Sequence, residues 1–172
     1  HTRTAAGLFD VSHMGQLELA GDDPAKALEA LVPGDIKGLK DGATRYTQLT
    51  NDSGGILDDL MVTRQSDRLL LVVNAASKEK DITHIRAALP TGHELLELSG
   101  RALIALQGPK SANVLSDLSS VKCASLPFMS MIEVSVCGIP SRIWRSGYTG
   151  EDGYEISCMD DDAEALARLL LA

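Results

Sequence analysis

The chain has 172 residues, of which 44% are hydrophobic and 23% charged, and its formal net charge at pH 7 is −8. This composition excludes a disordered chain and predicts one folded domain or two small ones. The acidic balance argues against nucleic-acid binding, and no apolar run approaches the roughly 20 residues of a membrane-spanning helix. Cys123, Cys137 and Cys158 are too far apart for a zinc knuckle or a disulfide framework, so buried thiols are expected.

The first half of the chain predicts two helices among several strands. Asp23 followed by Pro24 is typical of a helix start, and a second helix is expected from Ser77 to Pro90. The uninterrupted apolar run 69–73 indicates a strand that is covered on both faces. The other strands are expected over residues 16–19, 46–50, 56–63 and 94–98.

The second half predicts the same order of elements. Helices are expected after Gly108–Pro109 and after the acidic residues 160–162, which suit the positive end of a helix dipole. Strands are expected over residues 103–106, 132–136, 143–144 and 154–158. Both halves therefore approach the split βαβ arrangement, and the predicted fold class is α+β with mostly antiparallel sheets.

Two adjacent aspartates stand out in the segment from Gly54 to Leu60. In a strand, Asp58 and Asp59 point to opposite faces, and both faces are largely apolar here. We therefore expect at least one carboxyl to be partly desolvated, with a raised pKa and a functional role. An early bend that exposes both acids is the alternative.

A second candidate region runs from Arg145 to Glu155 and holds three glycines, two tyrosines and three acids. Tyr46, Tyr148 and Tyr154 stand next to glycine or polar residues, and a tyrosine ring with a polar tip suits a heteroaromatic ligand. Glu155 is expected to project from the following strand. A long hairpin loop with structural glycines is the alternative.

The segment Asp10–Gly15 places Ser12 and His13 beside an aspartate, which invites comparison with a catalytic triad. Sequence neighbours in an extended segment point apart, so a hydrogen-bonded structural role is favoured for His13. The chain has no glycine-rich dinucleotide motif, no phosphate-loop lysine motif and no metal-ligand spacing.

Four motifs in order resemble the aminomethyltransferase of the glycine cleavage system, the T protein. They are Leu8–Gly15, Gly54–Leu60, Leu106–Pro109 and Arg145–Glu155. The resemblance implies two interleaved subdomains with mostly antiparallel sheets, one formed by residues 1–18 with 102–172 and binding folate, the other by residues 19–101. Members of that family are longer, so the chain is expected to be an N-terminal and central fragment that lacks their C-terminal barrel-like domain.

This resemblance also implies a reaction. Such enzymes move a one-carbon unit from the aminomethyl-lipoyl arm of a partner, the lipoylated H protein, to tetrahydrofolate and release ammonia. By the motif match, Asp59 resembles the catalytic acid that orients a folate nitrogen and takes up its proton. The implied cofactor-binding residues are Tyr46, Asp58, Asn74, Tyr148 and Glu155. Thr63 stands where the family often has a tyrosine, and Phe128 where relatives are tyrosine-rich.

Three other functions remain open at this level. The chain resembles, less closely, the folate-binding module of dimethylglycine or sarcosine oxidoreductases. It is also compatible with a non-catalytic folate-binding protein in RNA modification or iron–sulfur maintenance, or with a fragment that binds no ligand. The resemblance implies a bacterial cytoplasmic or a mitochondrial matrix location.

Overall fold

A computed structural model describes all residues, 1–172, and the chain divides into two compact units. Unit 1 consists of residues 1–12 and 100–172, and unit 2 consists of residues 13–99. The boundary expected between residues 18 and 19 lies inside a strand, Gly15–Ala20, that pairs along its length within unit 2. The chain therefore passes from one unit to the other before this strand rather than within it.

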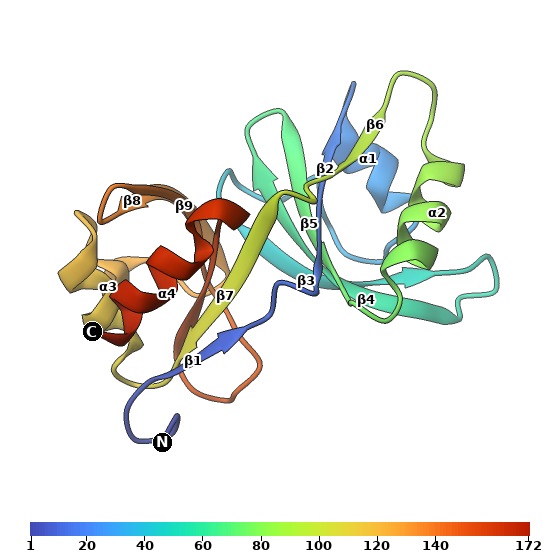
Figure 1. Cartoon of the computed structure of the whole chain (residues 1–172). Coiled ribbons are helices and arrows are strands. Elements are labelled where there is room, and N and C mark those ends of the chain that lie inside the picture. Colours follow the sequence, from blue (N-terminus) through green and yellow to red (C-terminus); the bar gives the residue numbers. More distant parts are fainter. The chain divides into compact units, whose positions relative to one another are not determined.

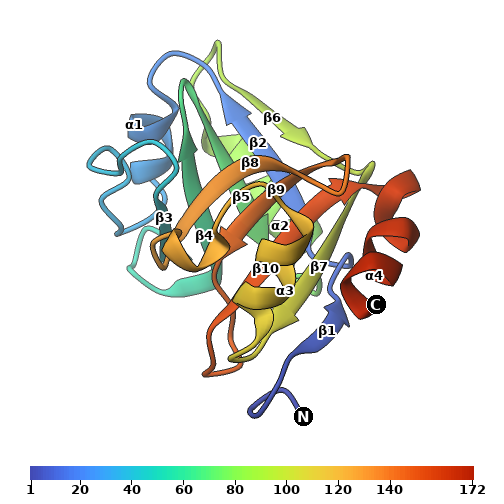
Figure 2. The same ribbon diagram turned by 90° about the vertical axis from the view of Figure 1, so that its left-hand side faces the viewer.

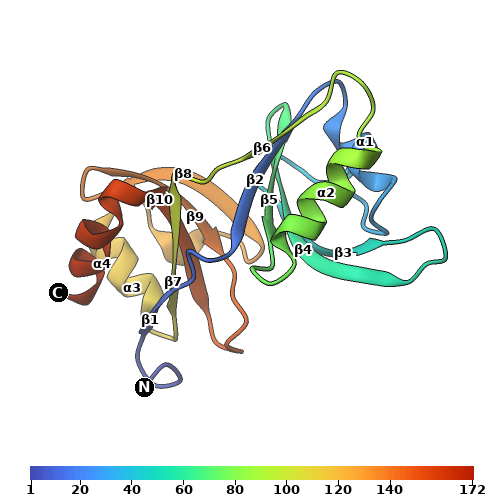
Figure 3. The same cartoon turned by 45° about the vertical axis from the view of Figure 1, so that its right-hand side comes forward.

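Unit 2 is a five-stranded antiparallel sheet with two helices. In chain order its elements are β2 (Gly15–Ala20), α1 (Pro24–Glu29), β3 (Thr44–Thr50), β4 (Ile56–Gln65), β5 (Arg68–Val73), α2 (Lys78–Ala88) and β6 (Glu94–Glu97). The strand order across the sheet is β3-β4-β5-β2-β6. Both helices contribute to one core cluster with alternate residues of the strands, so they cover the same face (Figure 3).

The alternation of side chains decides which residues of unit 2 are buried. Leu49 and Leu60 face this core and are at most 2% exposed. Asp58 lies opposite Leu49 in the register of β3 and β4, so it points to the same helix-covered side. Leu70 and Leu71 are both buried, which confirms that β5 is covered on both faces.

Unit 1 is also a five-stranded antiparallel sheet. Its elements are β1 (Gly7–Asp10), β7 (Arg101–Gln107), α3 (Ser111–Leu118), β8 (Ser130–Val136), β9 (Ile139–Arg145), β10 (Gly153–Met159) and α4 (Ala163–Leu171), with short 3₁₀ turns at Cys123–Ser125 and Asp160–Asp162. The strand order is β1-β7-β10-β9-β8. Helices α3 and α4 both pack on the core formed by this sheet (Figure 2).

The two sheets have the same strand order when each is followed along the chain, except at one edge. Strand β6 is the edge strand beside β2, whereas the equivalent place beside β7 is taken by β1 (Figure 1). The sequence did not predict β1, because four residues without polar alternation give no strand signal and its partner lies far along the chain.

The predicted strands and helices and the α+β class are otherwise confirmed. The cysteines differ in part from expectation. Cys123 and Cys158 are buried, but Cys137 is exposed, because it occupies the turn between β8 and β9 with a positive φ of 47°. No helix of the structure is both long enough and apolar enough to span a membrane.

Candidate functional site

The carboxylates of unit 2 lie at the beginning of β4. The turn before β4 is closed by Asn51, whose side-chain oxygen accepts hydrogen bonds from the backbone amides of Ser53 (3.1 Å) and Gly55 (2.8 Å). Gly54 adopts a φ of +80°, which a residue with a side chain rarely adopts. The pairing of β3 with β4 shifts by one residue between Leu49 and Thr50. This turn and irregularity set the positions of Asp58 and Asp59.

Asp59 is held by one residue from β3 and one that follows β5. The Tyr46 hydroxyl donates to its Oδ2 at 2.6 Å, and the Asn74 amide donates to its Oδ1 at 2.5 Å. The hydrogen bond to Asp59 raises the pKa of Tyr46, so the phenol keeps its proton and remains a donor. Both carboxyl oxygens of Asp59 therefore have fixed partners, although its side chain remains partly exposed.

Asp58 lies on the opposite face but shares Asn74 with Asp59. Its Oδ1 accepts hydrogen bonds from the Asn74 amide and from the Asp59 backbone amide, both at 2.9 Å. Burial acts to raise the pKa of Asp58, but these two bonds, with Ser77 and Asp81, outweigh it, and the pKa lies below its ordinary value. The expectation of a raised pKa is therefore wrong for Asp58, since donors accompany its burial.

A third carboxyl, which was not predicted from the sequence, lies at this place. Asp81, in the first turn of α2, is 3% exposed, and burial followed by the neighbouring Asp58 raises its pKa to about 7. A signal was available in the helix pattern. Asp81 precedes Ile85 by four residues, so it shares the buried face of α2 with that isoleucine.

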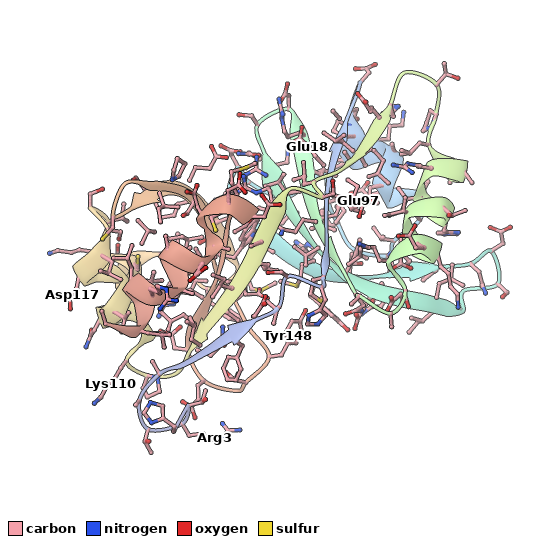
Figure 4. The ribbon with its side chains drawn as sticks, viewed as in Figure 1. Arg3, Glu18, Glu97, Lys110, Asp117 and Tyr148 are labelled. Carbon is pink, nitrogen blue, oxygen red and sulfur yellow. The ribbon has the colours of Figure 1, made fainter.

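Unit 1 holds a separate cavity of about 220 Å³ beside the β9–β10 loop. Tyr148 lies on this loop (Figure 4) and is 71% exposed. Phe9 from β1 brings a second aromatic ring to the wall. The lining residues are Phe9, Val11, Ala105, Gln107, Gly147, Tyr148, Thr149 and Glu155. An apolar, aromatic wall with one acid suits a flat ligand that carries N–H groups.

Glu155 projects from β10 into the lining of this cavity. Burial raises its pKa, while a hydrogen bond from the Ser146 hydroxyl to its Oε2 acts in the opposite direction. Glu155 is partly buried and bonded to Ser146, so it is not a fully solvated side chain of a strand face.

The β9–β10 loop is organised around Gln107, which is 1% exposed. Its amide donates to the backbone oxygen of Ser146 at 2.9 Å, and its Oε1 accepts from the Thr149 hydroxyl at 3.0 Å. A Cβ at Gly147 or at Gly153 would lie within 2.4 Å of the Gln107 side chain. Gly147 and Gly153 therefore make room for Gln107, which agrees with the alternative of structural glycines.

Tyr154 does not belong to the candidate site. It is fully buried in the core of unit 1, and its hydroxyl donates to the backbone oxygen of Cys123 at 2.9 Å. The expectation that all three tyrosines offer a face to a ligand is therefore wrong for Tyr154. As a residue of β10, it points to the opposite side of the sheet from Glu155.

The segment around His13 forms no triad. Asp10 accepts a hydrogen bond from the Ser12 backbone amide at 3.0 Å, and the Ser12 hydroxyl bonds to the backbone of Leu103. His13 is exposed. Ser12 thus extends the pairing of β1 with β7, and its motif is structural.

The structure brings the sequence-predicted residues together in two groups. Tyr46, Asp58, Asp59 and Asn74 form a hydrogen-bonded cluster in unit 2. Tyr148 and Glu155 line the cavity of unit 1. Thr63 is 1% exposed, and its hydroxyl pairs with that of Thr44 at 2.9 Å, so this side chain is committed to packing.

Known proteins resemble this chain over its whole length. The model of the GCVT N-terminal domain matches residues 1–172. An aminomethyltransferase from Halalkalibacterium halodurans is 41% identical over 98% of this chain and 47% of its own length. A mitochondrial aminomethyltransferase from Dictyostelium discoideum is 40% identical over 100% of this chain and 45% of its own length. The chain thus spans about half the length of these relatives.

Two solved structures share the fold. The glycine cleavage system aminomethyltransferase T from Bartonella henselae superposes with a TM-score of 0.91 and is 41% identical. The match covers 100% of this chain and 47% of the Bartonella chain. A chain of the heterotetrameric sarcosine oxidase from Corynebacterium superposes with a TM-score of 0.71 at 23% identity over 98% of this chain and 85% of its own, which shows a common fold alone. This chain therefore belongs to the family of the GCVT N-terminal domain.

Proposed function

We propose that this chain carries the tetrahydrofolate-dependent chemistry of a glycine cleavage aminomethyltransferase. The name of the Bartonella relative and its 41% identity support the reaction class. The observation that carries the proposal is the Asp59 carboxyl, which is fixed by Tyr46 and Asn74 and is nevertheless partly exposed. A fixed carboxylate without a compensating cation suits a reaction in which positive charge develops.

In the proposed reaction, Asp59 orients a secondary nitrogen of tetrahydrofolate and accepts its proton as the new carbon–nitrogen bond forms. Each of the two folate nitrogens forms a bond to the aminomethyl carbon, and in exchange the bonds from this carbon to its amine and to the lipoyl sulfur break. The two protons that leave the folate nitrogens then account for one ammonia and one lipoyl thiol. No electrons are gained or lost, so no redox partner is required.

The remaining predicted residues receive binding roles. Tyr46 and Asn74 hold the orientation of Asp59, and Asp58 fixes Asn74 in turn. In unit 1, Tyr148 offers a flat face to the pterin ring, and Glu155 accepts parallel N–H donors from its aminopyrimidine edge. The donor of the one-carbon unit in this proposal is a lipoylated H protein, and the location is bacterial cytoplasm or mitochondrial matrix.

The test is an Asp59→Asn substitution in the full-length protein that contains these residues. Ammonia release from aminomethyl-lipoyl H protein in the presence of tetrahydrofolate is expected to fall by about a hundredfold or more. Asp52→Asn, in the exposed turn before β4, is the matched control and should retain the rate. Undiminished ammonia release in Asp59→Asn would exclude the proposed role of this carboxyl.

Because the chain shares its fold with a chain of a sarcosine oxidase, a second candidate function is that of a folate-binding module of an oxidoreductase. The same assay separates the two functions. Tetrahydrofolate binding without any ammonia release from the aminomethyl-lipoyl donor would favour the oxidoreductase module, or a non-catalytic folate-binding protein.

A further inference from the structure

One buried acid of unit 2 has no role in the reaction described so far. Asp81 is 3% exposed, and its Oδ2 is a buried oxygen without a hydrogen-bond donor. The Oδ2 of Asp58 is in the same condition. A buried acceptor without a donor destabilises the folded state, so two of them on interacting side chains require an explanation.

The two orphaned oxygens belong to carboxyls that interact with one another. Asp58 raises the pKa of Asp81 by side-chain hydrogen bonding and by its charge, and the hydrogen bonding to Asp81 in turn lowers the pKa of Asp58. Two ionised carboxylates so close together repel, whereas one proton between them satisfies both oxygens. Nowhere in the chain do three acids, histidines or cysteines form a group suited to a metal ion.

The other charged groups near Asp81 do not replace such a proton. From β4, Asp59 adds a further negative charge, and from α2 only Lys80 acts in the opposite direction. Lys80 is exposed, and Lys78, on the same helix, forms an ion pair with Glu97 at 3.1 Å. The balance of charge around Asp81 therefore favours its neutral form.

We propose that Asp81 shares a proton with Asp58 and acts as a positioning residue for the carboxyl of Asp59. Its effect on catalysis rests on the proposed function of the chain, whereas the shared proton does not.

Asp81 is connected to Asp59 through Asp58 and Asn74. A neutral Asp81 donates to Asp58 and leaves Asp58 ionised, with its Oδ1 free to accept from Asn74 and from the Asp59 amide. Asn74 uses the same amide nitrogen to hold Asp59. When Asp81 loses its proton, its negative charge repels Asp58. The Asn74 amide, which holds Asp59, is then attracted toward two negative charges, those of Asp58 and Asp81.

Carbon-13 NMR of the aspartate carboxyls in the chain tests the shared proton directly. One aspartate carbon should titrate at about pH 7, far above the ordinary value near 4, and this step should disappear in Asp81→Asn. The carboxyl carbon of Asp58 should respond to the same step. If every aspartate of the unmodified chain titrates below about pH 5, the proposal is overturned, and this measurement needs no variant to fold.

Activity of the full-length protein tests the positioning role. Asp81→Asn keeps a neutral donor, so its rate should stay within about threefold and lose the dependence on a group titrating near pH 7. Asp81→Ala, which leaves Asp58 without a donor, should lose about tenfold or more. Glu79→Gln, an exposed acid of the same helical turn, is the matched control and should change neither the rate nor the pH profile.

The outcomes separate the two proposals. An unchanged pH profile in Asp81→Asn, or equal losses in Asp81→Asn and Asp81→Ala, would overturn the positioning role. Failure of Asp59→Asn to reduce ammonia release would instead overturn the proposed function, and the titration near pH 7 would persist.

Discussion

The two units have nearly the same strand order but build their candidate sites in different ways. In unit 2, the hairpin between β4 and β5 is tight, and the polar groups lie on the strands and just after β5, at Asp58, Asp59 and Asn74. In unit 1, the equivalent hairpin between β9 and β10 is opened into the loop 146–152 around Gln107. The same framework thus supports a charged cluster in one place and an apolar cavity in the other.

The difference also concerns how each site is held. The cluster of unit 2 depends on hydrogen bonds between side chains, two of which are ionisable carboxyls. Single substitutions can remove these bonds one at a time. The cavity of unit 1 depends on backbone shape, since Gly147 has a φ of +149° and lies against Gln107. We therefore expect substitutions of the loop glycine Gly147 in unit 1 to act on stability, whereas substitutions in the cluster of unit 2 also change ionisation and activity.

The largest effect is expected for Gly147→Val. The new side chain meets Gln107 and requires a backbone conformation that valine avoids, so the free energy of unfolding should fall by about 3 kcal/mol. Urea denaturation followed through Trp144, the single tryptophan and a residue of β9, measures this loss. Gly54→Ala in unit 2 is the control, since its site is open and only its φ of +80° opposes the substitution, at a cost of about 1 kcal/mol.

A smaller loss is expected for Asn74→Ala. Removal of the amide leaves Asp58 and Asp59 without their shared donor and should reduce the free energy of unfolding by about 2 kcal/mol. The pKa of Asp58 should rise, because a hydrogen bond that favours its charged form is lost. Carboxyl NMR and urea denaturation check both effects, and an unchanged Asp58 titration would contradict the interpretation of this cluster.

The cavity of unit 1 should bind folate in a pH-dependent way. Burial raises the pKa of Glu155, so this carboxyl takes up a proton at a higher pH than an ordinary glutamate and then stops accepting N–H donors. Affinity for tetrahydrofolate should therefore be full above this raised pKa and weaken as the pH falls through it. Calorimetric titration should show this trend, and Glu155→Gln should bind about tenfold more weakly with the trend removed.

The smallest effect is expected for Tyr46→Phe. This change removes one donor from Asp59 and keeps the ring, so ammonia release should fall by about threefold. The affinity for tetrahydrofolate should change little if the ring contributes by its face. A loss as large as that of Asp59→Asn would indicate that the phenol itself takes part in proton transfer.

Most of the elements follow from local patterns in the sequence. The alternation of apolar and polar residues, together with Gly, Pro and Asp at the ends of elements, was sufficient to predict the helices and nine of the ten strands. Strand β1 was not predicted, because it is defined by its pairing with β7, which lies far away in the sequence. The repeat of element order was visible, but the strand order in each sheet was not, since it depends on which edges meet.

The candidate site was predictable by residue type and not by partner. The two adjacent aspartates were identified as candidates from the sequence. The contact of Tyr46 with Asp59 was not predicted, because it depends on the register of β3 and β4, which neither strand specifies alone. Tyr154 was misread because its neighbours in sequence are polar while its position in β10 faces the core. Asp81 was missed because a charged residue in a first helical turn usually serves the helix dipole.

The place of β1 has a consequence for biosynthesis. Unit 2 is continuous in sequence, whereas unit 1 needs the first residues of the chain and those after residue 99. During synthesis β1 is translated before β7, so β1 has no partner in its own sheet until β7 has been translated. All of unit 2 is translated during this interval, so we expect it to be able to fold before β1 pairs with β7.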